Sequence, residues 1–142
     1  LLVNAVNGIY EKASKKNIEI SLQESESISL QLDEHWTSEA IINVLDNAVK
    51  YSPQNSHISI SVEKQHFYTR VAITDEGFGI PKNEYNKIFQ RFYRSNNPTV
   101  KKTEGSGVGL YLTRMILERQ GGMISVNSVP DKGSTFLLQF RN

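Results

Sequence analysis

The sequence contains no cysteine, and none of its apolar runs approaches the ~18 residues that a membrane-spanning helix needs. The first absence excludes disulfides, cysteine–zinc sites and thiol chemistry, and it is compatible with a reducing compartment. No stretch of the given residues has the pattern of a signal peptide either. The 16 basic and 15 acidic residues give a formal net charge of +1. A chain so nearly neutral has no overall field that favours a nucleic acid or an anionic membrane as its partner.

An initiator methionine is also lacking, because the chain opens with Leu1-Leu2-Val3. We therefore expect a piece of a longer protein. Hydrophobic residues make up 38% of the 142 residues and charged residues 22%, which is typical of a folded chain rather than a disordered one. A chain of this length can bury ~70% of the surface that it exposes when unfolded. Residues 1–142 are therefore predicted to form a single domain.

The spacing of apolar residues predicts alternating helices and strands. Apolar residues recur at helical spacing over 1–16, 34–50 and 108–120, with Asp33 as a candidate N-cap and Gly121-Gly122 as a helix end. Strict alternation predicts strands over 18–22, 28–32, 58–62, 67–73, 124–126 and 136–140. The prediction is an α+β fold, an α/β sandwich of two layers, in which helices cover one face of a mixed, mostly antiparallel sheet. Its expected core includes Trp36, Phe67, Phe136 and Phe140.

One long segment, 84–104, lacks this regularity. It opens with a short apolar cluster and continues as a polar stretch without any period. A loop of this length in a compact domain is usually functional or mobile. We expect a mobile lid.

The helix predicted over 34–50 carries an unusual polar stripe. Asn43, Asn47 and Lys50 stand at i, i+4 and i+7, so they lie along one side of the helix. Asparagine inside a helix costs roughly half a kcal/mol relative to alanine, so two on one stripe require a reason. The stripe is either an ordinary solvated face or a set of neutral oxygens and one ammonium that faces a metal–phosphate group.

Two glycine-containing segments add to this pattern. Asp75-Glu76-Gly77-Phe78-Gly79-Ile80-Pro81 follows a predicted strand, and its carboxylate can accept a hydrogen bond from an amine. Taken alone, an ordinary Asp-x-Gly turn explains it more simply. Gly105-Ser106-Gly107-Val108-Gly109-Leu110 opens the helix predicted over 108–120, where exposed amides attract phosphate. Its spacing is neither that of a dinucleotide-binding loop nor that of a P-loop.

Taken together, these segments resemble the sequence boxes of sensor histidine kinases. Asn43 to Pro53 resembles the N box, and Asp75 to Ile80 resembles the first glycine box. Ile88-Phe89-Gln90-Arg91-Phe92-Tyr93-Arg94 resembles the phenylalanine box, Gly105 to Leu110 the second glycine box, and Gly133-Ser134-Thr135-Phe136 the last box. All five stand in the family's order. The chain resembles the catalytic and ATP-binding domain of these kinases, which implies the Bergerat ATP-binding fold.

The resemblance implies roles for the matching residues. Asn47 would hold Mg²⁺, while Asn43, Lys50 and Arg94 would act at the phosphates as the catalytic residues. Tyr51 would stack on the base and Asp75 would accept a hydrogen bond from the adenine amino group. The other nucleotide-binding residues would shape the adenine pocket (Gly77, Gly79, Ile80 and Thr135), wrap the phosphates (Gly105, Gly107, Gly109 and Leu110) or reach the γ-phosphate (Arg91, besides Arg94).

The resemblance also implies a function and partners. The chain would bind Mg-ATP and donate the γ-phosphoryl group to a histidine on a dimerisation domain of the same protein, which would then serve a response regulator. His35, His57 and His66 do not match the phosphoacceptor motif, so we expect them to be structural or solvent-facing. The fragment would be a monomer and the full-length protein a homodimer. The fragment would be a cytoplasmic domain of a protein anchored in the bacterial membrane.

Three alternatives remain at this point. Related ATPases of the gyrase, chaperone and mismatch-repair type activate water with a glutamate, where this chain has Asn43. An anti-sigma serine kinase shares the nucleotide site but usually lacks so complete a phenylalanine box. A degenerate kinase would bind ATP only as a switch, and a measurement of phosphotransfer would separate it from an active kinase.

Overall fold

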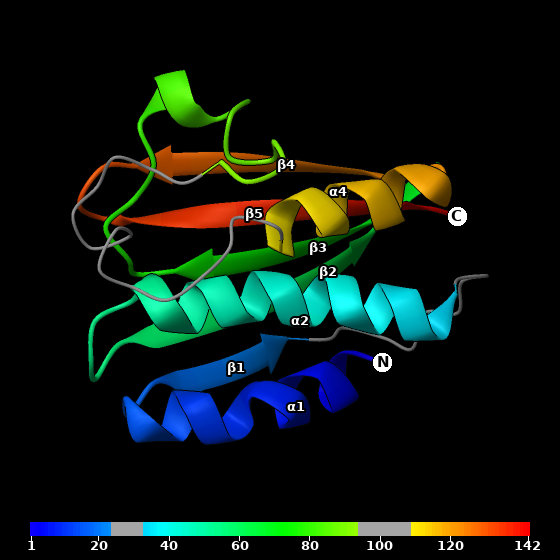
Figure 1. The fold of residues 1–142 in the computed structure, drawn as a ribbon. Coiled ribbons are helices and arrows are strands. Elements are labelled where there is room, and N and C mark those ends of the chain that lie inside the picture. Colours follow the sequence, from blue (N-terminus) through cyan, green and yellow to red (C-terminus); the bar gives the residue numbers. More distant parts are fainter. Residues whose placement is uncertain (24–32, 94–108) are drawn as a thin grey trace.

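The computed structural model describes residues 1–23, 33–93 and 109–142 (Figure 1). The strand predicted over 28–32 and the lid predicted over 84–104 from residue 94 onward lie outside the described residues. Three of the predicted site residues, Arg94, Gly105 and Gly107, lie outside them as well. No described helix is both long enough and apolar enough to cross a membrane.

In the described part of the chain, five strands form one sheet in the order β1-β2-β3-β5-β4. The strands are β1 (Glu19–Gln23), β2 (His57–Lys64), β3 (Tyr68–Asp75), β4 (Met123–Val129) and β5 (Gly133–Arg141). Strands β1 and β2 pair in parallel, and every other pair is antiparallel. The helices are α1 (Leu2–Lys15), α2 (Glu34–Tyr51), α4 (Gly109–Arg119) and the short 3₁₀ helix η1 (Lys82–Glu84). Helices α1, α2 and α4 lie on one face of the sheet, which confirms the predicted two layers (Figure 1).

The core lies between α2 and the helix-facing side of the sheet. Ile60, Ile73 and Leu138 come from three neighbouring strands, and all three have no exposed surface. They pack against Leu45 of α2, which is also fully buried. Strands β3 and β5 bury every second residue over most of their length, as alternation predicts, because successive side chains point to opposite faces of a sheet.

Both predicted helix boundaries are confirmed where the structure describes them. The Asp33 carboxylate accepts a hydrogen bond from the backbone N–H of Trp36 at 3.0 Å, which caps the first turn of α2. At the end of α4, the N–H of Gly122 donates to the carbonyl of Leu117 at 2.8 Å. Gly121 has a φ of +77°, a left-handed conformation that glycine adopts without steric cost.

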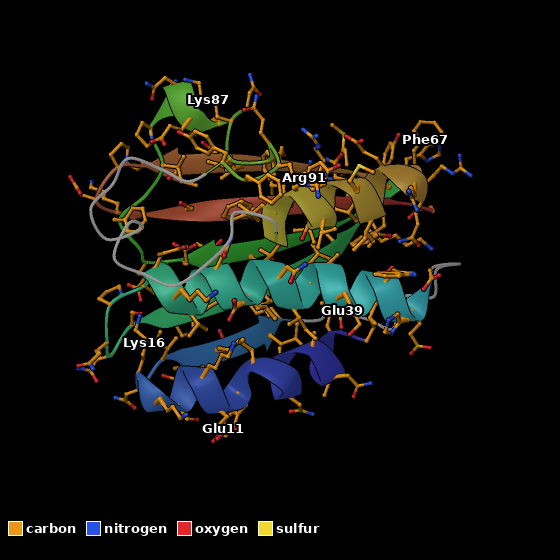
Figure 2. All side chains as sticks on the ribbon, viewed as in Figure 1. Glu11, Lys16, Glu39, Phe67, Lys87 and Arg91 are labelled. Atoms are coloured by element: carbon orange, nitrogen blue, oxygen red, sulfur yellow. The ribbon has the colours of Figure 1, made fainter. Side chains whose placement is uncertain are left out.

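Two of the four expected core aromatics are not in the core. Phe136 and Phe140 are buried as predicted, but Trp36 is 52% exposed and Phe67 is 71% exposed. Phe67 lies in the turn before β3 begins, at the same end of the molecule as the C-terminus (Figure 2). Trp36 precedes Asn43 by seven residues and therefore lies on the polar side of α2.

Lys16, which follows α1, closes the C-terminal end of α2 (Figure 2). Its Nζ donates to the carbonyl oxygens of Val49 at 2.9 Å, Lys50 at 3.0 Å and Ser52 at 2.6 Å. The last carbonyls of a helix have no partner within the helix, and a cation there also interacts favourably with the helix dipole. Burial lowers the pKa of Lys16, which is consistent with its position between the two helices.

We expect Lys16→Met to lower the free energy of unfolding by about 1–2 kcal/mol, because it removes the hydrogen bonds to these carbonyls and keeps most of the apolar stem. Lys15→Met is the matched control, since Lys15 is exposed at the neighbouring position. Urea unfolding followed by circular dichroism measures both variants. Equal stabilities of the two variants would show that Lys16 does not hold the end of α2.

Candidate nucleotide-binding site

Most of the predicted site residues that the structure describes meet at one end of the molecule. This end is formed by the last turns of α2, the end of β3 and the start of β5, and α4 begins beside the middle of α2 (Figure 1). This end lies opposite the end that carries Phe67. Antiparallel pairing of β3 with β5 places the last residue of one strand beside the first residues of the other, with Asp75 opposite Ser134.

The polar stripe of α2 lies along one side of the helix as predicted, and Asn43 on it contacts the start of α4. Asn43, Asn47 and Lys50 are all partly buried along α2. The side-chain amide of Asn43 donates to the carbonyl of Gly109 at 3.4 Å. A Cβ on Gly109 would lie 3.9 Å from Cβ and Cγ of Asn43, which is ordinary contact distance. The stripe thus borders the N-terminal end of α4, where helix amides attract anions.

Lys50 also belongs to a small charge network. Its Nζ lies 2.9 Å from Oδ2 of Asp46, and the Nζ of Lys12 in α1 lies 3.1 Å from Oδ1 of the same carboxylate. Burial acts to raise the pKa of Asp46, but the hydrogen bonds and charges of the two lysines outweigh it and lower the pKa below its usual value. Asp46 therefore stays ionised at neutral pH and fixes the direction of Lys50.

Asp75, the last residue of β3, offers an acceptor beside the stripe. Its Oδ1 accepts backbone hydrogen bonds from Gly77 at 2.9 Å and Ser134 at 3.2 Å. Both bonds from the described part of the chain go to Oδ1, which leaves Oδ2 as the acceptor for a ligand. Burial raises the pKa of Asp75, although the two backbone hydrogen bonds oppose the shift.

Two glycines allow close approach of backbone around Asp75. A Cβ on Gly77 would lie 2.8 Å from the carbonyl oxygen of Tyr51, closer than real side chains come. Gly79 has a φ of +79°, and a Cβ there would collide with the carbonyl oxygen of Val129. The backbone of the segment after Asp75 therefore lies in close contact with both the end of α2 and the end of β4. Only glycine meets both requirements at position 79.

Tyr51 and Ile80 border the same region. The ring of Tyr51 meets that of Phe78 edge to face, with centroids 5.5 Å apart. Ile80 packs against the core, and its backbone N–H donates to the hydroxyl of Ser128 at 2.7 Å. An aromatic ring, an apolar side chain and a free carboxylate oxygen together suit a flat base that carries an amino group.

Thr135 lies on the other face of the sheet from Asp75. Thr135 stands opposite Thr74, and the two hydroxyls lie 3.0 Å apart. Asp75 stands opposite Ser134, which is buried, so their side chains share the helix-facing side. Sequence reasoning missed Ser134. Counting back by two from the buried Phe136 would have placed Ser134, and not Thr135, on the side of Asp75.

Two further predicted residues, Leu110 and Arg91, lie in different surroundings. Leu110, at the start of α4, packs against the core. Arg91 has its guanidinium carbon 4.7 Å from the centroid of the exposed Phe92 ring. Within the described residues Arg91 forms no ion pair. The structure thus brings together the α2 stripe, the Asp75 loop and Gly109, whereas it places Thr135 outside this group.

The donor set fits a nucleotide bound with Mg²⁺ better than a resident metal. Within the described residues there is no group of three or more histidine, aspartate or glutamate side chains that could hold a metal. Mg²⁺ takes few protein oxygens and completes its shell with water and phosphate. The amide oxygen of Asn47, on the stripe that borders α4, meets that requirement.

Comparisons with known proteins agree with this geometry. The family model described as histidine kinase-, DNA gyrase B-, and HSP90-like ATPase matches residues 32–142. The sensor histidine kinase WalK of Bacillus subtilis is 34% identical over 108 residues, which are 75% of this chain and 18% of that protein. The sensor protein kinase WalK of Staphylococcus haemolyticus is 32% identical over 140 residues, which are 97% of this chain and 23% of that protein.

Among solved structures, the chain is similar to the nucleotide-free catalytic domain of the histidine kinase ThkA. The TM-score is 0.84 at 27% sequence identity, and the match covers 97% of this chain and 88% of that domain. The fold is therefore that of a histidine kinase catalytic domain. The chain spans less than a quarter of the length of either WalK relative.

Proposed function

Because the chain belongs to the family of histidine kinase-, DNA gyrase B- and HSP90-like ATPases, we propose that it binds Mg-ATP and donates the γ-phosphoryl group to a histidine. The observation that carries this proposal is the position of Asn43 against Gly109. This contact joins the amide stripe of α2 to the N-terminal end of α4, and α2 also contacts the Asp75 segment at its last residue, Tyr51.

Each side chain has a distinct task in this proposal. Oδ2 of Asp75 accepts a hydrogen bond from the adenine amino group, and Tyr51 contacts the base. Lys50 neutralises phosphate charge from the position in which Asp46 holds it. Asn47 supplies an oxygen ligand to Mg²⁺, which when bound offsets negative charge on the phosphates. Arg91 and Arg94 would reach the γ-phosphate from the lid, and Gly105 and Gly107 would wrap the phosphates.

Phosphoryl transfer requires positioning and charge stabilisation rather than a covalent intermediate on the protein. A ring nitrogen of the acceptor histidine forms a bond to the γ-phosphorus, and the bond from that phosphorus to the β–γ bridging oxygen breaks, so ADP leaves. Asn43 favours this reaction over hydrolysis, because an amide cannot take a proton from water. Histidine is itself the nucleophile and needs no such base.

The acceptor histidine comes from another domain. His35, His57 and His66 are all exposed, as expected. His57 contacts the hydroxyl of Ser21 at 2.8 Å, while the rings of His35 and His66 lie edge to face with those of Trp36 and Phe67. We propose that the acceptor lies on a dimerisation domain of the same, membrane-anchored homodimeric protein, and that a response regulator receives the phosphoryl group from it.

A mixing experiment tests the function directly. We expect the chain to bind Mg-ATP in calorimetry and to label a separately purified dimerisation domain from a sensor kinase when radiolabelled ATP is added. The matched control is the same acceptor domain with its histidine replaced by glutamine, which should take no label. Label on the chain's own histidines, or binding of ATP without any transfer, would contradict the kinase assignment.

A further inference from the structure

Ser128, near the end of β4, connects two parts of the candidate site. Its hydroxyl accepts from the backbone N–H of Ile80 at 2.7 Å and donates to the carbonyl of Gly133 at 2.8 Å. It also lies 2.9 Å from the hydroxyl of Ser134. The phenol of Tyr85 donates to the carbonyl of Ser128 at 2.9 Å and accepts from its N–H at 2.8 Å. One side chain therefore touches the first glycine box and the start of β5.

The hydrogen count decides the direction of the bond between the two serines. A hydroxyl has one hydrogen to donate and two lone pairs that accept. The hydrogen of Ser128 goes to the carbonyl of Gly133, which can only accept, and one of its lone pairs receives the N–H of Ile80. The second lone pair is left for Ser134. Ser134 must therefore be the donor in the bond that joins the two hydroxyls.

This assignment determines what Ser134 can offer to a ligand. Its only hydroxyl hydrogen is committed to Ser128, so the lone pairs of Ser134 remain as acceptors. Ser134 is buried and stands directly opposite Asp75, and its backbone N–H donates to Oδ1 of that carboxylate. Oδ2 of Asp75 is also an acceptor. The two side chains form an edge that accepts hydrogen bonds and donates none.

We propose that Ser128 is a positioning residue that makes this site selective for a purine with an amino group at C6. The inference rests on the proposed nucleotide site and goes beyond it to the origin of its base preference. Adenine presents an N6–H₂ donor at this position, whereas guanine and hypoxanthine present an oxygen acceptor. An oxygen against two acceptors leaves buried polar groups unpaired, which costs more than losing one ordinary hydrogen bond.

Replacement of Ser128 by alanine changes this edge. The hydroxyl hydrogen of Ser134 loses its acceptor and becomes free to turn toward the ligand. It then donates to an oxygen at C6, and the penalty against an oxo base falls. A purely structural role for Ser128 predicts no change in base preference, because loosening of the strand would weaken the binding of both kinds of base alike.

The experiment compares ATP with inosine triphosphate, which carries oxygen at C6 and lacks the second amino group of guanine. Calorimetry on the whole chain gives the ratio of the two dissociation constants. We expect the dissociation constant of inosine triphosphate divided by that of ATP to fall about tenfold in Ser128→Ala, while the affinity for inorganic tripolyphosphate stays unchanged. Ser125→Ala is the matched control, since Ser125 lies on the same strand but on its other face.

Tyr85→Phe separates chemistry from rigidity. It removes the phenol that holds the backbone of Ser128 and leaves the serine hydroxyl in place, so it should keep the preference for ATP. An equal fall of the ratio in Tyr85→Phe, or an unchanged ratio in Ser128→Ala, would overturn the inference while leaving the nucleotide site intact. A parent chain that binds neither nucleotide would overturn the proposed function and the inference together.

Discussion

Asp75→Asn should weaken the binding of ATP by roughly ten- to a hundredfold, because the substitution puts a donor where the adenine amino group also donates. The structure fixes the orientation of the new amide. Oδ1 of Asp75 accepts two backbone N–H groups, from Gly77 and Ser134, and only the oxygen of an asparagine can accept both. The NH₂ group is therefore forced into the position of Oδ2, where it opposes the base.

Glu76→Gln is the matched control for this variant. Glu76 is the next carboxylate along the chain, it is exposed, and it accepts from the backbone N–H of His57 at 2.5 Å. Its neutralisation should leave the affinity for ATP within about twofold. Calorimetry on both variants and the parent settles the comparison. Equal affinities for adenine and guanine nucleotides in the parent would remove the basis for assigning Asp75 to the base.

The affinity for ATP should also depend on pH through the same carboxyl. Burial raises the pKa of Asp75 above its ordinary value of 3.8, against the pull of the two backbone hydrogen bonds. As the pH falls through this raised pKa, Oδ2 gains a proton and stops accepting, so the affinity falls. The folded state binds this proton more readily than the unfolded state does, so ionisation of Asp75 costs stability as the pH rises through the same range. Asp75→Asn should lack both effects.

Periodicity predicted much of this fold for a physical reason. In a helix or strand with one buried face, apolar residues recur with the period of that element. The sequence therefore predicted the approximate bounds of α2, its cap at Asp33 and the alternation of β5. The same rule would have predicted the exposure of Trp36, seven residues before Asn43, had the tryptophan not been assigned to the core with the other apolar residues. Large aromatic residues are not always buried.

The parts that could not be predicted depend on contacts between segments far apart in the sequence. Ser128 meets Ile80 and Tyr85 from more than 40 positions away, and Lys16 meets the end of α2 from more than 30. Periodicity does not identify such residues, because the role of a single hydroxyl or ammonium at the end of an element depends on groups that only the folded chain brings near it. The candidate site was thus predicted in its motifs, but not in the hydrogen bonds that orient them.

The Asn43→Glu variant should hydrolyse part of its bound ATP to ADP in the absence of an acceptor histidine. Asn43 lies one turn before Asn47 and against the carbonyl of Gly109, on the stripe that would face the phosphates. The related ATPases carry glutamate at this position, where it takes a proton from water. A positioned general base typically contributes ~10²–10⁴-fold to such a step.

The gain in this chain should be smaller than that full factor. The carboxylate would stand close to the Gly109 carbonyl and would lose the bond that the amide donates to it. The N-terminal end of α4 stabilises a negative charge there, which keeps the carboxylate ionised but makes it a weaker base. Repulsion from the phosphates also weakens binding of ATP, so the comparison has to be made on bound ATP.

Single-turnover hydrolysis at saturating ATP provides that comparison, with Asn43→Gln as the matched control. Glutamine has the length of glutamate and an amide in place of the base, so it should hydrolyse ATP as slowly as the parent. We expect the glutamate variant to release phosphate about ten- to a hundredfold faster than the glutamine variant. Identical rates in the two variants would mean that Asn43 does not withhold the water. The barrier to hydrolysis would then have to come from another part of the site.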